Sequence, residues 1–272
     1  MDNYIPFLRP FFANNQKKVL QVRQEQLDTV NLLINKRHSI LKNPNLELNV
    51  APFSYIDSLL DLKVDDCDSV PTDPELVTLC FELINGGTNT TSTAIEWAMA
   101  RIIDNSNIQD KLYKDIVSVV RDRPVDDPGL EKMPYLQAFV KELLRKHPPT
   151  YFSMTHAAVE AAKLGGYDIP PDANLELFLP TIIEDERLWS KPLEFNPERF
   201  ISGGDTVDIT GSAGIRMILF GAGRRICPGL AMGTTHISLM VARMGQAFEW
   251  RLHLTEPNRE WTVVMKHDNI EG

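Results

Sequence analysis

Apolar residues recur along most of the chain at intervals that predict helices. Between residues 13 and 42 they follow near-helical spacing with polar residues between them, which is typical of an amphipathic helix. Residues 74–105 are apolar on nearly all sides, and this pattern indicates a long helix buried at the centre of a fold. The same periodicity predicts further helices at 107–121, 134–147 and 228–248.

The long central helix has a recognisable start signal in the sequence Pro-Thr-Asp-Pro-Glu that ends at residue 75. Asp73 is expected to cap the helix, and Pro74 suits the first helical position because proline has no N–H to leave unsatisfied. Glu75 favours the positive end of the helix dipole. We therefore expect the helix to begin at Pro74.

Short strands are predicted after residue 150, where the helical periodicity stops. Between 151 and 180, Gly165-Gly166 and Pro170-Pro171 mark turns that separate short strand-like runs. A polar, proline-rich and irregular stretch follows, and the tail after the last predicted helix reads as a strand pair. The element order is thus mostly helical, with a small sheet late in the chain.

Composition and charge exclude several functional classes. The chain has 272 residues, which is enough to bury a core, and its net charge of −9 argues against a general nucleic-acid binder. Its three cysteines lie far apart without a CxxC pair, which excludes a zinc knuckle and a thioredoxin-type redox site. No apolar run reaches the roughly 18 residues of a membrane-spanning helix, and we expect no signal peptide.

The first twelve residues form a dense apolar patch interrupted by Pro6 and Pro10. Prolines at these positions exclude a regular helix interior. Two interpretations stay open: the patch packs beneath the next helix, or it makes a peripheral contact with a membrane surface.

The most informative stretch is the loop FGAGRRICPG at residues 220–229. Its glycines allow the backbone to approach a flat ligand closely. Cys227 lies just before a predicted helix start at Pro228, where the unpaired N–H groups favour an anionic thiolate that is suited to bind a metal. The neighbouring arginines can pair with carboxylates of a cofactor. A buried structural cysteine fits the same residues equally well.

This loop resembles the haem-binding loop of the cytochrome P-450 haem-thiolate monooxygenases. The fixed positions of the family pattern F-x-x-G-x-R-x-C-x-G are filled by Phe220, Gly223, Arg225, Cys227 and Gly229. The resemblance implies a haem cofactor with Cys227 as the axial thiolate on the iron. It also implies that Arg225 pairs with a haem propionate and that Phe220 packs against the thiolate side of the ring.

A second resemblance concerns three charged residues. Glu142 and Arg145 are spaced to face one another on a predicted helix, and a solvated surface pair is the common alternative. Their order before the cysteine loop makes them similar to the family's E-x-x-R motif, and residues 195–200 resemble its P-E-R-F segment. The resemblance implies a buried network of Glu142, Arg145 and Arg199 that serves folding and haem retention.

The middle of the long predicted helix resembles the family's oxygen-binding segment through Gly86, Gly87, Thr90 and Thr91. Two glycines inside a helix cost about 1 kcal/mol each relative to alanine, and close approach to a ligand is one reason for them. The resemblance implies that Thr90 orders a water molecule for proton delivery. Asn89 stands where the family has an acid, and an amide cannot relay protons as a carboxyl group does.

His156 ends the run YFSMTH at residues 151–156, in the predicted strand region. The family often places a basic residue there against a haem propionate. An ordinary strand histidine is an equal alternative. We also expect His147 to have a structural role.

The resemblance extends over residues 1–272 and implies a mainly α fold with a small β part: the C-terminal portion of the cytochrome P-450 fold, with the N-terminal portion absent. Within this incomplete domain we expect a helical part with the long central helix at 13–150. A small sheet and an irregular meander should follow at 151–219. The haem-thiolate loop, the last long helix and a terminal strand pair should occupy 220–272.

The implied function is insertion of one oxygen atom of O2 into a small lipophilic, fatty-acid-like substrate, with electrons from an NADPH-dependent reductase. Similarity to plant microsomal members implies the endoplasmic reticulum membrane. Because we find no anchor in this sequence, a cytoplasmic or peripheral location stays open. The alternative function is that of a truncated, non-catalytic remnant, which acts at most as a binding or interaction module.

Overall fold

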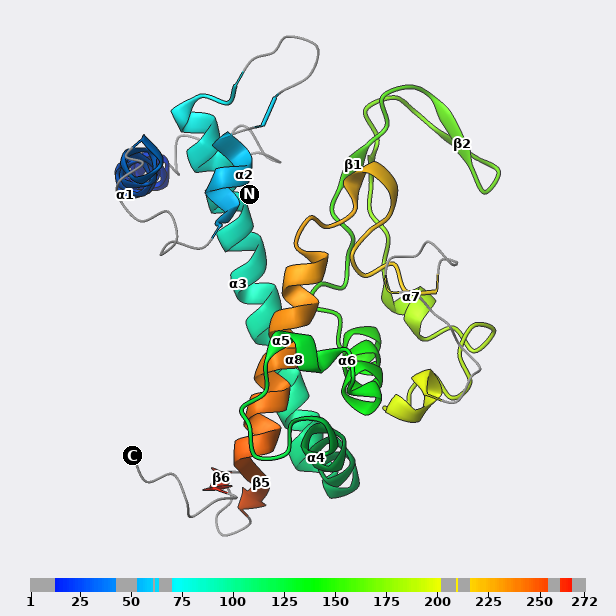
Figure 1. Cartoon of the computed structure of the whole chain (residues 1–272). Coiled ribbons are helices and arrows are strands. Elements are labelled where there is room, and N and C mark those ends of the chain that lie inside the picture. Colours follow the sequence, from blue (N-terminus) through cyan, green and yellow to red (C-terminus); the bar gives the residue numbers. More distant parts are fainter. Residues whose placement is uncertain are drawn as a thin grey trace. The chain divides into compact units, whose positions relative to one another are not determined.

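A computed structural model describes residues 13–42, 53–60, 62–63, 70–201, 209, 216–253 and 260–265. The chain divides into two compact units, Met1–Gly86 and Gly87–Gly272. Both contain helices, and the second also contains short antiparallel strand pairs (Figure 1). The apolar patch predicted at residues 1–12 lies outside the described residues.

The first unit contains α1 (Ala13–Lys42), α2 (Tyr55–Leu60) and the beginning of α3 (Asp73–Asp104), which continues into the second unit. The helix predicted over 13–42 is therefore confirmed. The apolar core of the first unit consists of Val30, Ile34, Leu59, Leu76 and Val77. Two polar contacts supplement this core. Arg23 Nη2 donates to Thr78 Oγ1 over 2.6 Å, and the Arg37 guanidinium binds both carboxylate oxygens of Asp57 at 2.7 and 2.6 Å.

The start of α3 differs by one residue from the sequence prediction. The helix begins at Asp73 rather than Pro74. Its first turn is closed by Glu75, whose Oε2 accepts hydrogen bonds from the N–H and the hydroxyl of Thr72 at 2.8 and 2.7 Å. Glu75 thus reaches back to the residue before the helix, as the acidic member of a capping box does, and Asp73 is not the capping residue.

The expectation that α3 is buried on all sides is wrong. Its second-unit part buries Ala94, Ala98 and Ile102 in the core, but the Trp97 side chain is 42% exposed. In the first unit Ile84 is also exposed. The described elements of each unit cover only part of the helix surface, so the apolar residues on its remaining faces stay accessible.

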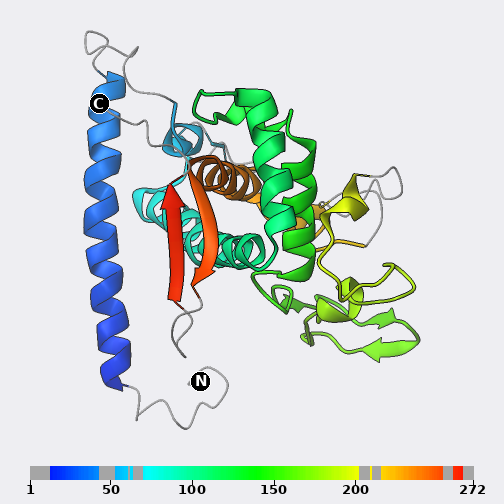
Figure 2. The ribbon, with the colours of Figure 1, turned by 90° about the horizontal axis from the view of Figure 1, so that it is seen from below.

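In the core of the second unit, the buried side chains of α3 pack with those of α4 (Ser106–Val120), α5 (Asp127–Leu130), α6 (Pro134–Lys146) and α8 (Leu230–Ala247). α4 packs against α6 and α8, and α6 also contacts α8 (Figure 2). The helices predicted at 107–121, 134–147 and 228–248 are thereby confirmed to within two residues at each end. None of the helices in the described ranges is both long and apolar enough to cross a bilayer.

The strands form three separate antiparallel pairs. β2 (Ala162–Leu164) and β3 (Tyr167–Ile169) are joined at Gly165-Gly166, where both glycines have positive φ, and β1 (His156–Ala157) pairs with β4 (Asn174–Leu175). β5 (Phe248–His253) pairs with β6 (Glu260–Met265). The predicted strands and the terminal strand pair are confirmed.

An irregular segment connects the small strands to the cysteine loop. It contains α7 (Pro180–Ile183) and the short 3₁₀ helix η3 (Pro197–Phe200), and a second 3₁₀ turn, η4 (Gly223–Arg225), lies within the loop itself. η3 packs against α6. The packing between them places the P-E-R-F segment beside the helix that carries Glu142 and Arg145.

Candidate functional site

The cysteine loop curls back on itself immediately before α8. Gly221 and Gly223 have φ values of +73° and +65°, a region that residues with a Cβ rarely adopt. The Cys227 N–H donates to the Phe220 carbonyl over 2.7 Å and so closes the loop. This local geometry, which depends on the two glycines, brings the cysteine back to the base of the loop.

Cys227 is half-buried, and its sulfur is not in a disulfide. Its carbonyl accepts a 3.3 Å hydrogen bond from the Leu230 N–H, the first residue of α8. A Cβ placed on Gly229 would lie 3.8 Å from the Cys227 sulfur, an ordinary van der Waals distance. The thiol therefore lies at the N-terminal end of an 18-residue helix, as the sequence indicated, although that helix begins at Leu230 rather than Pro228.

The other residues of the loop divide between core and surface. The Phe220 ring is half-buried and packs against the core of the second unit. Arg225 lies at the end of η4 with its side chain exposed. One aromatic residue thus anchors the loop, and one guanidinium is presented to its outside.

Gly87, the second glycine of the pair in α3, comes close to α8. A Cβ added to Gly87 would lie 3.7 Å from the methyl carbon of Met232, five residues after Cys227. Thr90, one turn further along α3, is half-buried, whereas Asn89 and Gly86 are exposed. The helix continues without interruption through this segment. The part of α3 that begins at Gly87 therefore lies beside the helix that follows the cysteine loop.

The three charged residues predicted to interact do meet in the structure. The Arg145 guanidinium binds Glu142 through two contacts of 2.8 and 2.9 Å, and Arg199 Nε lies 3.0 Å from Glu142 Oε2. The side chains of Glu142 and Arg145 are fully buried, and that of Arg199 is 9% exposed. The alternative interpretation, a solvated surface pair, is excluded by this burial.

The same arginines hold the irregular segment through its main chain. Arg145 donates to the carbonyl oxygens of Ile183 and Pro192 at 2.7 and 3.0 Å, and Arg199 donates to that of Ser190 at 2.8 Å. In return, the Asn196 N–H donates to Glu142 Oε1 over 2.8 Å. The network therefore fixes the backbone that runs from α7 to η3 against α6.

His147 lies at the end of α6, beside this network. Its ring stacks on that of Trp97 with 4.0 Å between centroids and an interplanar angle of 7°, and its Nε2 accepts a 2.8 Å hydrogen bond from Arg101 Nε. Burial, together with the positive charge of Arg101, lowers the pKa of His147 to about 4. The imidazole is therefore neutral near pH 7. It connects α3 to α6, a structural role that agrees with the sequence-based expectation.

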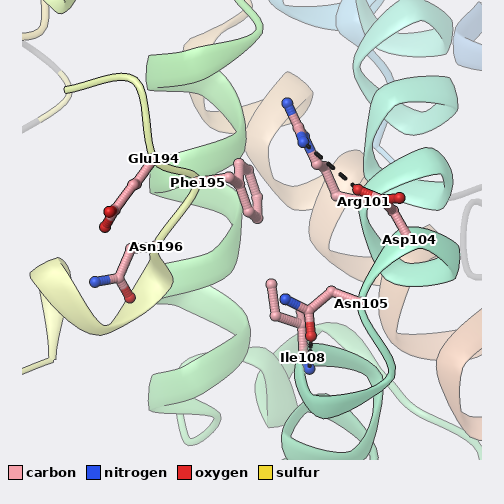
Figure 3. A pocket seen from close by; sticks show the side chains of 7 residues that line it. All are labelled: Arg101, Asp104, Asn105, Ile108, Glu194, Phe195 and Asn196. Carbon is pink, nitrogen blue, oxygen red and sulfur yellow. Dashed lines mark hydrogen bonds and ion pairs between the residues drawn. The ribbon is translucent and has the colours of Figure 1, made fainter. Parts of the chain in front are cut away.

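A cavity of about 340 Å³ adjoins the network (Figure 3). Its wall consists of Arg101, Asp104, Asn105, Ile108, Glu194, Phe195 and Asn196. Arg101 is engaged by His147, lies over the Phe195 ring at 5.1 Å and approaches Asp104 at 4.0 Å. The residues predicted to bind haem do not line this cavity, and no motif in the sequence predicted it.

His156 is exposed on β1, where its Nδ1 lies 2.6 Å from the Met154 carbonyl oxygen. Exposed apolar side chains accompany it, with the rings of Phe152 and Phe178 in contact at 5.1 Å between centroids. The histidine thus lies exposed on a short strand, near in sequence to exposed apolar side chains.

Fold and site together define a mainly helical protein with one cysteine-centred loop and one buried arginine–glutamate network. The family model for cytochrome P450 matches residues 1–271. This chain belongs to the cytochrome P450 family, which implies a haem cofactor. The recognised family and the mainly α fold are confirmed.

Relatives in plants and known structures agree with this assignment. The chain is 36% identical over 250 residues to cytochrome P450 98A1 of Sorghum bicolor, covering 92% of this chain and 47% of that protein. It is 40% identical over 223 residues to flavonoid 3'-monooxygenase of Arabidopsis thaliana, covering 79% and 43%. The structure of retinoic acid bound cyanobacterial CYP120A1 superimposes with a TM-score of 0.73 at 22% identity, covering 90% of this chain and 55% of the other. The chain spans about half the length of the curated relatives it matches.

Proposed function

We propose that this chain is the haem-binding part of a monooxygenase and that Cys227 is the axial ligand of the haem iron. The observation that carries the proposal is the cysteine loop, in which two positive-φ glycines hold a half-buried sulfur at the start of α8. Haem-thiolate proteins use one cysteine as the proximal ligand, and this loop offers one sulfur in that role.

The neighbouring residues fit a flat prosthetic group that carries carboxylates. Arg225 is exposed beside the sulfur and can form charge-assisted hydrogen bonds with a propionate. Phe220 fixes the loop to the core on the proximal side. His156 is proposed as a further propionate partner, since its imidazole is exposed on β1.

The glycine pair and Thr90 are proposed to serve the opposite side of the group. Gly87 reduces the bulk of α3 where that helix approaches Met232, and Gly86, at which a Cβ would meet no atom within 4 Å, is proposed to leave room for the group. When bound, the haem supplies the redox centre at which O2 is reduced and one oxygen atom is transferred to substrate. Thr90 orders the water that delivers protons. Asn89 is exposed, and its amide cannot relay protons as a carboxyl group does.

A small lipophilic organic molecule is the proposed substrate, with an NADPH-dependent reductase as electron donor. Two matched relatives are named flavonoid 3'-monooxygenase and (S)-N-methylcoclaurine 3'-hydroxylase, which favours aromatic substrates alongside the fatty-acid-like class expected from the sequence. The endoplasmic reticulum membrane is the proposed location.

A non-catalytic remnant is the second candidate, and the exposed apolar surface of α3 favours it. Ile84 in the first unit and Trp97 in the second are exposed, and exposed apolar side chains of this kind suit an interaction module. Such a protein would bind haem poorly, because burial of apolar area contributes about 25 cal/mol per Å².

One spectroscopic experiment separates the two candidates. The chain is expressed with haem supplied and is then reduced in the presence of carbon monoxide. A strongly red-shifted Soret band that Cys227→Ala abolishes supports thiolate-bound haem. Colourless protein supports the remnant, and a band that persists in Cys227→Ala removes Cys227 from its proposed role.

A further inference from the structure

One face of α4 contacts both elements that carry the buried arginine–glutamate network. Lys111 and Asp115 are four residues apart and so share this face. Asp115 contacts the start of α6, which carries Glu142 and Arg145, whereas Lys111 contacts η3, which carries Arg199. Both contacts lie within the second unit.

Asp115 supplies the N-terminal cap that α6 lacks in its own sequence. Met133, which precedes the helix, makes no side-chain capping bond, and Pro134 has no N–H to donate. The next two N–H groups, those of Tyr135 and Leu136, both donate to Asp115 Oδ2 at 2.9 and 3.0 Å. The carboxylate therefore stands at the positive end of the α6 dipole and does what a local capping residue does elsewhere.

Lys111 makes the corresponding contact with η3. Its Nζ lies 2.6 Å from Glu198 Oε1 and 5.8 Å from the centroid of the Tyr135 ring. Glu198 directly precedes Arg199 in the sequence. The lysine thus touches the first turn of α6 and the short helix that supplies the third member of the network.

The network has little tolerance for displacement. The Glu142 carboxylate accepts hydrogen bonds from Arg145 and from the Asn196 N–H, and Arg199 Nε lies beside it, all at 2.8 to 3.0 Å. Glu142 lies eight residues into α6, about 12 Å along a rigid helix at 1.5 Å per residue. A shift of the helix start is therefore carried to the buried carboxylate.

From these contacts we infer that Lys111 and Asp115 are positioning residues, which set the place of α6 and η3 so that Glu142, Arg145 and Arg199 meet. Both residues act through the network, because the contacts described above join them to α6 and η3. Burial raises the pKa of Asp115, and its two backbone hydrogen bonds oppose that shift. Keeping the carboxylate charged at this position therefore costs free energy. The effect on haem retention rests on the proposed function, whereas the effect on α6 does not.

Amide hydrogen exchange on the full chain tests the capping contact without haem. In Asp115→Ala the N–H groups of Tyr135 and Leu136 should exchange about tenfold faster or more, because each loses an acceptor that bears charge. Asp115→Asn keeps an acceptor oxygen and should restore part of the protection. Asp110→Ala, on an exposed position of the same helix, should leave both amides unchanged. Unchanged exchange in Asp115→Ala would overturn the inference.

A double-mutant cycle tests the role of Lys111. Melting temperatures are measured for Lys111→Met, for Glu198→Gln and for the combined variant. If Lys111 holds η3 through Glu198, the two substitutions together should lower the melting temperature by less than the sum of their separate effects. Additive effects would remove Lys111 from the proposal.

The carbon monoxide spectrum then tests whether the loss of Asp115 affects haem binding. Asp115→Ala is compared with Ile116→Ala, which alters a fully buried neighbour on α4, at temperatures where both variants are equally folded. Positioning predicts that Asp115→Ala loses more of the red-shifted band, and an equal loss in both would overturn this step. If the wild-type chain never shows that band, the proposed function fails, while the exchange experiment still decides the role of Asp115.

Discussion

The Glu142–Arg145–Arg199 network and the cysteine loop lie in the same unit but differ in how their polar groups are satisfied. In the network, Glu142 and Arg145 have no exposed surface, and the arginines bind carboxylate and carbonyl oxygens of the protein itself. In the loop, Arg225 is exposed and the sulfur of Cys227 is only half-buried. The charged groups of the network contact other groups of the protein, whereas the loop leaves its guanidinium and part of its cysteine exposed.

This difference separates the contribution to stability from the contribution to chemistry. A buried charge that loses its partner is costly, whereas a half-exposed thiol contributes little to the free energy of unfolding. Substitutions in the network should therefore unfold the protein, and substitutions in the loop should leave it folded but unable to bind the ligand. The four predictions below test this separation.

The largest expected effect follows from Arg145→Ala. Removing the guanidinium leaves Glu142 buried with one fewer partner and frees the carbonyls of Ile183 and Pro192, so we expect a loss of about 3–5 kcal/mol in the free energy of unfolding. Denaturant titration measures it. Arg187→Ala is the matched control, because the Arg187 side chain is exposed where it pairs with Asp185, so its removal should lower the free energy of unfolding far less. Equal losses in the two variants would contradict the distinction.

Acidification should destabilise the protein through His147. Its pKa is about 4 in the folded state and near 6.5 when unfolded, so the unfolded chain binds the proton more readily between these values. The contribution is fully present above pH 6.5 and is lost as the pH falls to 4, on the order of 3 kcal/mol. His147→Gln keeps an acceptor for Arg101 but does not titrate, so subtracting its stability profile isolates the histidine. Parallel profiles would exclude this role.

Alanine substitution at two glycines should change the free energy of unfolding in opposite directions. Gly223→Ala forces a Cβ onto a residue at φ +65° and should cost about 1–2 kcal/mol. Gly233→Ala, inside α8, should instead stabilise by about 0.5–1 kcal/mol, because alanine is the better helix former. Within the described residues a Cβ at either position meets no atom within 4 Å, so backbone conformation alone decides the sign. Thermal unfolding of the two variants measures the difference. If both substitutions stabilise or both destabilise the protein, the positive φ of Gly223 does not decide the conformation of the loop.

The smallest expected effect on stability comes from Cys227→Ala. The half-buried sulfur makes no disulfide, so we expect a change of about 1 kcal/mol or less in the free energy of unfolding. The same variant should lose the thiolate-dependent red shift of the Soret band completely. A large loss of stability without haem would mean that the cysteine is part of the core, contrary to the comparison above.

The sequence predicted the helices well because their periodicity is a local property. α4, α6 and α8 are bounded within two residues of the predicted ranges, and the three network residues were recognised from two short motifs. The central burial of α3 was predicted wrongly, because an apolar composition does not say which faces the neighbouring elements cover.

Contacts made through the backbone or from another element were not predictable. The acceptors of Arg145 and Arg199 are main-chain oxygens, so no side-chain pattern marks them. The cap of α6 comes from Asp115, twenty residues before Tyr135 and on a different helix, and local capping signals do not reveal it. The roles proposed for Cys227 and Thr90 remain predictions to be tested on the haem-bound protein.

The carbonyl contacts of the two arginines have a consequence for sequence variation. Because Ile183, Ser190, Pro192 and Glu194 are recognised by their oxygens, the identities of exposed side chains such as those at 190 and 194 can change without loss of these bonds. The length of the segment cannot change so freely, since inserting or deleting one residue would move every later carbonyl out of reach. Related proteins should therefore differ widely in residue type along this segment while conserving its number of residues.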